Sequence, residues 1–262
     1  MSRLNSKQST ILLIRSQLYF LLLISSFSLL ASEPIKVKSG KYQTALLELY
    51  TSEGCSSCPP ADRWFNQLVK APGTGLDVLA LAFHVDYWDY IGWKDIYADP
   101  TFTNRQRHLA RVNRQSSVYT PEFFLNGAES RGTARVIAKI QSINNILSTV
   151  NLELILQPHK HKIELHLNSQ FDAKINPLVQ FVVFENNLSS DIKSGENSGR
   201  KLNHQQVVRY LSPEQVLTSE ISETINIQPK WKQQNLGVGA IVKSKNGDYL
   251  QSVFSPFNAN FK

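Results

Sequence analysis

Two cysteines three positions apart, Cys55 and Cys58, are the only cysteines in the chain. Two thiols at this spacing can close a small disulfide ring. A thiolate attacks a disulfide through a mixed disulfide, which a second thiol can then resolve. The pattern therefore predicts a redox dithiol, with Cys55 as the attacking thiol and Cys58 as the resolving one.

Two other interpretations of the pair stay open. The first is a structural disulfide, although closing so short a loop constrains the unfolded chain little. The second is half of a metal site, but zinc usually needs a second Cys pair or spaced His residues, and the chain has no second Cys pair. Copper handling by Cys55, Cys58 and His84 is a related alternative, since soft thiolates suit Cu(I). We expect no resident metal and no cofactor.

The elements around the pair place it at a turn from a strand to a helix. The apolar run Leu46–Tyr50 has strand length, Gly54 marks a turn, and the Pro59-Pro60 pair suits the first turn of a helix. A helix N-terminus carries partial positive charge, which stabilises a thiolate. The nearby acid Glu53 opposes this effect.

A second apolar strand, Asp77–His84, follows this helix, so the segment predicts a βαβ unit with parallel strands. Loops at the carboxyl ends of parallel strands share one edge of the sheet. His84 and Asp86 should therefore lie on the same edge as Cys55. His84 could tune the thiolate or shuttle a proton, or it could simply end the strand; Asp86 could orient His84 or cap a turn.

The next segment is aromatic and then basic. Its aromatic residues could line a cleft for a protein substrate or pack a long loop; they are Tyr87, Trp88, Tyr90, Trp93 and Tyr97. Residues Thr101–Gln115 are predicted to form a helix with a basic face, capped by Thr101 or Thr103.

Asn126-Gly127 after a short apolar run predicts a hairpin whose first strand is Glu122–Asn126, and Pro121 must then begin that strand. An apolar stripe predicts a helix over Arg131–Val150. Beyond Asn151, short alternating runs separated by turn signals predict antiparallel strands of a sandwich or partial barrel. The fold class predicted is thus an α/β domain followed by an antiparallel β-rich domain.

Several stretches resemble the bacterial secreted proteins called the domain of unknown function 1223 family. They are Glu48–Asp62, Ala82–Gly92 with Trp93, Tyr119–Pro121, Asn126-Gly127 and Gly195–Arg200. The resemblance implies a thioredoxin-like fold with a mixed sheet flanked by helices, and a periplasmic setting. Thioredoxin-like folds place a cis-proline beside the dithiol, so a cis Thr120–Pro121 bond is predicted there, with Thr120 and Pro121 as substrate-binding residues. The loop Gly195–Arg200 is either a neighbour of the dithiol or a plain surface loop.

The chain begins with a basic segment, an apolar stretch of about 13 residues and the small residue Ala31, which together are typical of a secretory signal peptide over residues 1–31. The apolar run is shorter than the ~20 residues of a spanning helix, so no stable membrane insertion is expected after cleavage. The formal net charge of +7 falls to +4 without Arg3, Lys7 and Arg15, which does not suggest nucleic-acid binding.

These observations predict a signal peptide (residues 1–31), a thioredoxin-like domain (42–150) and a β-rich domain (151–262). The expected function is a thiol–disulfide oxidoreductase of the Gram-negative periplasm, or a secreted one, acting on protein thiols or disulfides with a separate redox partner. The non-enzymatic alternative is a binding module with a structural disulfide. The Ser56-Ser57 pair between the cysteines matches neither thioredoxins nor strong bacterial oxidants, so the direction of electron flow stays open.

Overall fold

The computed structural model describes residues 34–70 and 75–255, and these form one compact unit. Its helices are α2 (Cys58–Lys70), α3 (Pro100–Val112) and α4 (Thr133–Ile143), with short 3-10 turns at η2 (Asp89–Ile91), η3 (Ala173–Ile175) and η4 (Gln233–Asn235). Its strands are β1 (Ile35–Lys38), β2 (Ala45–Thr51), β3 (Val78–His84), β4 (Glu122–Leu125), β5 (Ala128–Glu129), β6 (Val150–Pro158), β7 (Lys162–Phe171), β8 (Leu178–Glu185), β9 (Leu188–Asp191), β10 (Lys201–His204), β11 (Val207–Leu211), β12 (Gln215–Val216), β13 (Glu220–Asn226), β14 (Leu236–Lys243) and β15 (Tyr249–Ser255). The predicted signal peptide, residues 1–31, lies outside the described residues.

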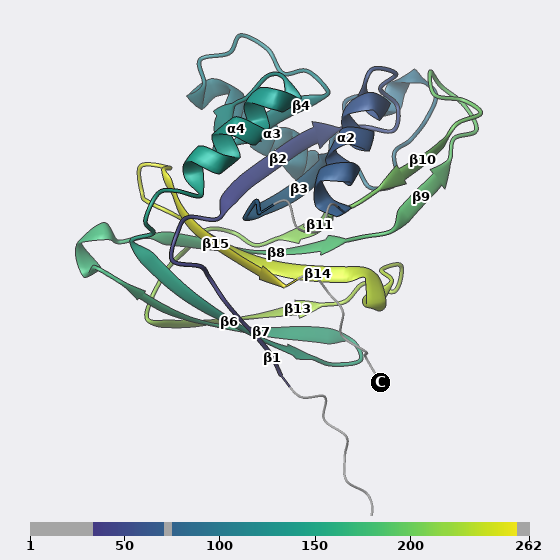
Figure 1. Cartoon of the computed structure of the whole chain (residues 1–262). Coiled ribbons are helices and arrows are strands. Elements are labelled where there is room, and N and C mark those ends of the chain that lie inside the picture. The colour runs from purple at the N-terminus through teal and green to yellow at the C-terminus, as the bar shows by residue number, and fades with distance from the viewer. Residues whose placement is uncertain (1–33, 71–74, 256–262) are drawn as a thin grey trace, which may run out of the picture. The chain divides into compact units, whose positions relative to one another are not determined.

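The main sheet has nine strands in the order β15-β14-β8-β11-β3-β2-β4-β5, with β12 paired to β8 (Figure 1). Strands β2 and β3 are parallel, as the predicted βαβ unit requires, and β11 continues the sheet in parallel on the other side of β3. Strands β4 and β5 form the predicted hairpin at Asn126-Gly127. The parallel pairing brings the carboxyl ends of β2 and β3 to one edge, which is where the cysteines follow.

Helices cover the β2–β3 part of the sheet on both faces. Alternate side chains of a strand point to opposite faces. Leu47 and Leu49 therefore pack with Phe65 of α2 and Ile140 of α4 in one core. Their neighbours Leu46 and Tyr50 pack in another core that includes Phe102 and Leu109 of α3, as well as Phe184 and Ile241 from the C-terminal strands. Both faces of β2 are buried, which fits its nearly continuous apolar sequence.

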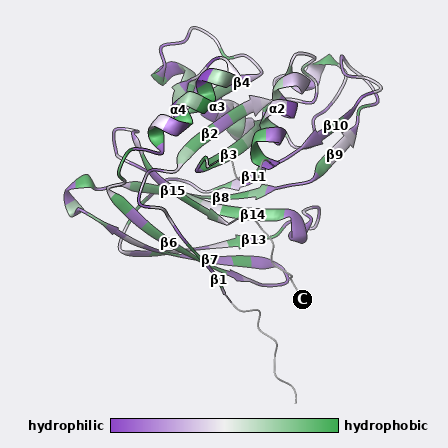
Figure 2. Cartoon of the chain, viewed as in Figure 1, coloured by the Kyte–Doolittle hydropathy of each residue, from purple (hydrophilic) through white to green (hydrophobic). Residues whose placement is uncertain are grey.

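A second sheet of four antiparallel strands, β1-β6-β7-β13, packs against strands from the C-terminal half of the main sheet. Strand β6 alternates between buried and more exposed residues, as expected for a sheet with one face in the core. Figure 2 shows hydrophobic residues concentrated along β8 and β14. These strands contribute both to the core shared with the second sheet and to the core that contains Phe102 and Leu109 of α3. Strands β9 and β10 form a separate hairpin, and Asn66 of α2 donates a hydrogen bond to the carbonyl of Asn203 in β10.

The mixed α/β class is confirmed, but two local predictions were wrong. The helix predicted over Arg131–Val150 ends at Ile143, because Asn144 donates to the carbonyls of Gln43 and Asp77 and the following residues pair with the segment before β2. Helix α3 is capped by Asp99, whose side chain accepts from the backbone N–H of Thr101, and not by Thr101 or Thr103.

The predicted boundary between residues 42–150 and 151–262 stays a prediction. Strands from both segments share the nine-stranded sheet, since β11 pairs with β3. Among the residues that the structure describes, no helix combines the length and the apolar character needed to span a membrane.

Candidate functional site

The two cysteines lie in the turn that connects β2 to α2 and at the first residue of α2. The backbone N–H of Cys55 donates to the Ser52 carbonyl, and that of Cys58 donates to the Cys55 carbonyl, so two consecutive turns carry the chain into the helix. Cys55 and Cys58 form a disulfide, with their Cα atoms 5.4 Å apart. The dithiol thus occupies the helix N-terminus that the sequence predicted for it.

Neither sulfur-bearing residue is accessible to solvent in this structure. Cys55 and Cys58 are both 0% exposed, whereas Ser56 and Ser57 between them are exposed. Gly54 lies against Trp88, and a Cβ at Gly54 would come within 3.2 Å of both the Cβ and the carbonyl oxygen of Trp88. A side chain at position 54 would therefore push the cysteine turn and Trp88 apart.

Thr120 contacts the dithiol from β4's N-terminal side. The Cys55 Sγ is 3.7 Å from the Thr120 carbonyl oxygen, and the Ser57 hydroxyl donates to the same oxygen at 3.3 Å. The indole N–H of Trp88 donates to the Thr120 hydroxyl at 2.7 Å. The Thr120–Pro121 bond is cis, as predicted.

A loop from the C-terminal half of the chain closes over the other side of the cysteine turn. This cover loop, residues 193–200, contains one buried side chain, Asn197, whose amide donates to the carbonyls of Glu53 at 2.8 Å and Cys55 at 2.9 Å. The exposed Glu196 accepts a hydrogen bond from the backbone N–H of Ser56 at 3.2 Å. The loop Gly195–Arg200 is therefore a neighbour of the dithiol.

Beneath the cysteine turn lies a buried network of acids and histidines, centred on Glu53. The Glu53 carboxylate accepts from the indole N–H of Trp93 at 2.9 Å and contacts Nε2 of His204 at 3.1 Å. The backbone N–H of Glu53 donates to Asp95 at 2.8 Å, and the same Asp95 oxygen contacts Nδ1 of His84 at 2.7 Å. The side chains of Glu53, Asp95 and His84 are 0% exposed, so these contacts replace water for groups that are costly to bury unpaired.

His84 and Asp95 form an ion pair in this network. Burial by itself lowers the pKa of His84, but the hydrogen-bonded Asp95 carboxylate outweighs burial and raises that pKa above its ordinary value. Burial likewise raises the pKa of Asp95, but the charge and hydrogen bond of His84 and the backbone N–H groups of Glu53 and Tyr97 together outweigh burial and lower that pKa. The His84 ring also packs edge-on against His204 with centroids 4.8 Å apart, while its Nε2 makes no hydrogen bond to a described residue.

Asp62 places a further acid near the dithiol. It follows Cys58 by one helical turn on α2, so the two residues share a face, and both are buried. Its carboxylate accepts from the Thr51 hydroxyl at 2.8 Å. Burial raises the pKa of Asp62, against the opposing effects of His204 and His84.

The structure brings most of the predicted site residues together. Cys55, Cys58 and Thr120 are in direct contact, and His84 lies in the network below the turn. Asp86 lies elsewhere: its carboxylate accepts from the Thr103 hydroxyl at 2.5 Å, and Asp95 takes the position beside His84.

Several of the side chains that surround the dithiol were not predicted from the sequence. Asp62 fell within a motif that carries the family resemblance, so a buried acid one turn after Cys58 could have been suspected. No comparable signal marked Asp95 or His204, which reach the site through the loop after β3 and through β10.

No group of three or more His, Cys, Asp or Glu side chains in residues 34–70 and 75–255 is placed to hold a metal ion. In this structure the sulfurs of Cys55 and Cys58, two of the three ligands of the copper-handling alternative, are joined to each other in a disulfide.

A cavity of about 500 Å³ lies beside Pro121. Its lining includes Tyr119, Pro121, Phe123 and Arg131. The Arg131 guanidinium lies over the Tyr119 ring at 5.5 Å. Thr120, whose carbonyl contacts Cys55, lies in sequence between two residues of this lining, Tyr119 and Pro121.

Comparison with known proteins gives a family and two similar folds. The model of the family described as protein of unknown function (DUF1223) matches residues 46–243. A crystal structure of an Agrobacterium tumefaciens protein has a TM-score of 0.62 at 23% identity, covering 86% of this chain and 98% of that one. HBP35 of Porphyromonas gingivalis has a TM-score of 0.63 at 14% identity, covering 84% of this chain and 77% of that one. At these identities the two structures are alike in fold alone, and no curated protein matches the chain.

Proposed function

The chain belongs to the family described as protein of unknown function (DUF1223), and from the geometry of its site we propose that it is a thiol–disulfide oxidoreductase with a thioredoxin-like domain. The observation that carries the proposal is the Cys55–Cys58 disulfide at the N-terminus of α2, facing the Thr120 carbonyl. The helix N-terminus favours the thiolate form that disulfide exchange requires.

The thioredoxin-like assignment rests on the arrangement around the dithiol. Parallel strands β2 and β3 flank α2 in the chain, the hairpin β4–β5 continues the sheet beside β2, and helices pack on both faces. In this arrangement the cysteine turn and the start of β4 meet at one edge of the sheet, so a substrate chain that pairs with the start of β4 would also lie beside the cysteine turn.

Exchange proceeds in two balanced steps. A substrate thiolate attacks the Cys55 Sγ, the Cys55–Cys58 bond breaks, and a mixed disulfide forms while Cys58 leaves as a thiolate. A second substrate thiolate then attacks the substrate sulfur of the mixed disulfide, which forms the substrate disulfide and releases the Cys55 thiolate. The substrate loses two electrons and the dithiol gains them; the reverse sequence reduces a substrate disulfide.

Asp62 supplies or accepts the proton of Cys58. Because its pKa is raised by burial, the carboxyl holds a proton to higher pH than an exposed Asp does and can protonate the leaving Cys58 thiolate. Asp62 also lines a cavity of about 460 Å³ bordered by Arg63 of α2 and Lys201 of β10, through which its proton can exchange with solvent.

The substrate is a polypeptide in extended form. The Thr120 backbone lies next to Cys55, and its sequence neighbours Tyr119 and Pro121 line the cavity that also includes Arg131. An extended chain pairing with Thr120 as an added strand would place a cysteine near the Cys55 Sγ. Protein thiols or disulfides of the periplasm or of the secreted space are the proposed partners, in keeping with the export signal expected at residues 1–31 and the oxidised state of the dithiol.

One observation favours a second candidate, a binding module with a structural disulfide. Both cysteines are fully buried, and a disulfide that no partner reaches is inert. If the protein is an oxidoreductase, either the cover loop or Trp88, which lies against Gly54, must move before a partner thiolate reaches Cys55.

Partner trapping and redox titration separate the two candidates. With Cys58→Ser, the oxidoreductase should accumulate mixed disulfides through Cys55 that a Cys55→Ser control does not form. Equilibration with glutathione buffers should give a potential above about −300 mV, whereas a lower potential would favour a structural bond. Failure of the trap together with a potential below that value would refute the oxidoreductase.

A further inference from the structure

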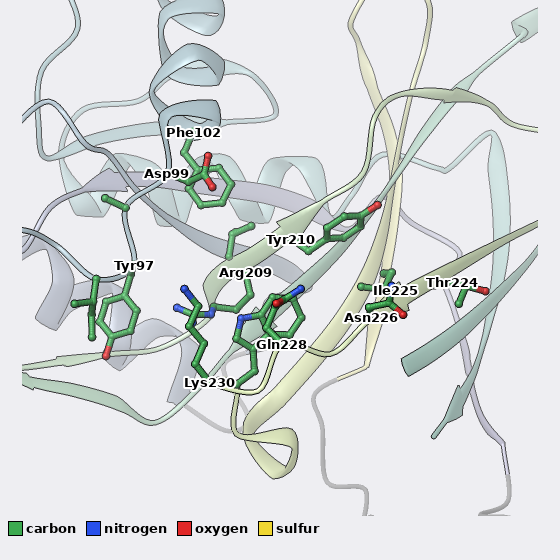
Figure 3. Close-up of a pocket in the computed structure, with 14 residues that line it drawn as sticks. Tyr97, Asp99, Phe102, Arg209, Tyr210, Thr224, Ile225, Asn226, Gln228 and Lys230 are labelled. Carbon is green, nitrogen blue, oxygen red and sulfur yellow. The ribbon is translucent and has the colours of Figure 1, made fainter. Parts of the chain in front are cut away.

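A third cavity lies between the loop that precedes α3 and strands β11 and β13. Its volume is about 490 Å³, and its lining includes Tyr97, Phe102, Arg209 and Lys230 (Figure 3). Trp231 also lines it. Neither cysteine lines it, and the proposed exchange chemistry does not use its residues.

Arg209 lies at an irregularity in its strand. The pairing of β11 with β8 shifts register between Val208 and Tyr210, so Arg209 has no partner of its own in the ladder. Such a bulge changes the direction in which a side chain points and often accompanies a functional site. Here it accompanies a charged side chain that lines the cavity.

The Arg209 side chain is only 6% exposed. Its guanidinium lies 5.4 Å from the Tyr97 ring centroid and 6.0 Å from that of Trp231. Its Nε is 3.3 Å from a Glu185 oxygen, yet this atom makes no hydrogen bond to any residue in the described ranges. The ion pair with Glu185 therefore leaves the Nε–H of this buried guanidinium without a hydrogen bond within the described part of the chain, and a guanidinium with five N–H donors has capacity for a further acceptor.

The other charges at the cavity limit what that acceptor can be. Lys230 adds a second cation at the exposed rim, and Asp99 adds one acid, whose carboxylate already accepts from the Thr101 N–H and hydroxyl. Glu185 partly neutralises Arg209 and also accepts from the backbone N–H of Lys232. With both acids present the site suits a single negative charge better than a phosphate dianion, and the aromatic walls suit an apolar body.

We propose that this cavity binds a small organic monocarboxylate, with the carboxylate on the Arg209 guanidinium and Lys230 and the apolar body against Phe102 and Trp231. The planar guanidinium matches a carboxylate with two parallel N–H donors, which an ammonium group cannot reproduce. The aromatic rings on either side exclude water from the pair and strengthen it.

The test is calorimetric titration of the purified protein with benzoate, acetate and inorganic phosphate. Benzoate should bind saturably and more tightly than acetate, because only benzoate has a ring to place against the aromatic walls. Arg209→Lys should weaken benzoate binding about tenfold or more, because lysine keeps the positive charge but lacks the two parallel N–H donors of the guanidinium. Lys230→Ala, at the exposed rim, should weaken binding about threefold or more through the lost charge.

The exposed Lys232 provides a matched control, because it neighbours Lys230 in sequence but does not line the cavity. Lys232→Ala should bind benzoate as the wild type does. Three results would overturn the proposal: no saturable binding of any probe, phosphate binding tighter than benzoate, or equal weakening by Lys230→Ala and Lys232→Ala. If Arg209→Lys does not fold, the comparison of the two lysine variants still decides.

Discussion

Asn197→Ala is expected to make the Cys55–Cys58 disulfide more reactive toward small reductants. The Asn197 amide is the one buried side chain of the cover loop, and it donates to the carbonyls of Glu53 and Cys55. Each such bond contributes about 0.5–1.5 kcal/mol net. The Asn197 Oδ1 has no partner among the described residues, so its removal offsets part of the loss.

A net loss of about 1–2 kcal/mol raises the population of the open loop about 5- to 30-fold. The rate of disulfide reduction by dithiothreitol, followed by thiol release at fixed pH, should rise by the same factor if local opening limits access. The rate should depend only weakly on added urea, because local opening exposes little surface compared with global unfolding.

Ser198→Ala is the matched control, since Ser198 lies in the same loop and its hydroxyl donates only to the Lys193 carbonyl within it. This variant should reduce at the wild-type rate. An unchanged reduction rate in Asn197→Ala, or equal acceleration in both variants, would refute the role of Asn197 in holding the cover loop closed. A steep urea dependence would also refute it, because reduction would then require unfolding of the whole chain.

Three further predictions concern stability. Arg105→Leu removes the partner that donates two 2.8 Å hydrogen bonds to the fully buried Glu48 carboxylate, so urea titration should show a loss of about 3–5 kcal/mol, and a loss below about 1 kcal/mol would contradict this. Gly237→Ala places a Cβ 2.2 Å from the ring of Phe184, which is itself fully buried, so the free energy of unfolding should fall by about 1–3 kcal/mol; an unchanged melting temperature would contradict it. Because the pKa of His84 is raised, the folded state holds the His84 proton to higher pH than the unfolded state does. The stabilisation from this proton is therefore complete below the ordinary pKa of 6.5 and is lost as pH rises through the folded pKa. His84→Gln should flatten the resulting fall in the free energy of unfolding with pH, and an equal slope in both proteins would count against the ion pair.

Local chemistry allowed the elements around the dithiol to be predicted from the chain itself. The apolar run through Leu49, the Pro59-Pro60 pair and the turn at Asn126-Gly127 each act within a few residues, so a strand, a helix start and a hairpin could be inferred from them. The parallel pairing then followed from the βαβ connection, which placed His84 on the edge that carries Cys55. The two errors at helix ends, at Ile143 and Asp99, arose where contacts with distant residues or an unexpected cap set the boundary.

What surrounds the dithiol was decided by tertiary structure alone. Asn197 lies 142 residues from Cys55 in sequence and His204 lies 151 from Glu53, yet each makes a direct contact at the site. No propensity or spacing acts over such separations, because these contacts depend on β11 pairing with β3 and on the hairpin β9–β10 reaching α2. The sequence by itself determined that a dithiol lies at a helix N-terminus on a parallel sheet edge; whether its sulfurs are open to solvent, and which acids and histidines lie beneath them, depended on how the distant half of the chain packs over that edge.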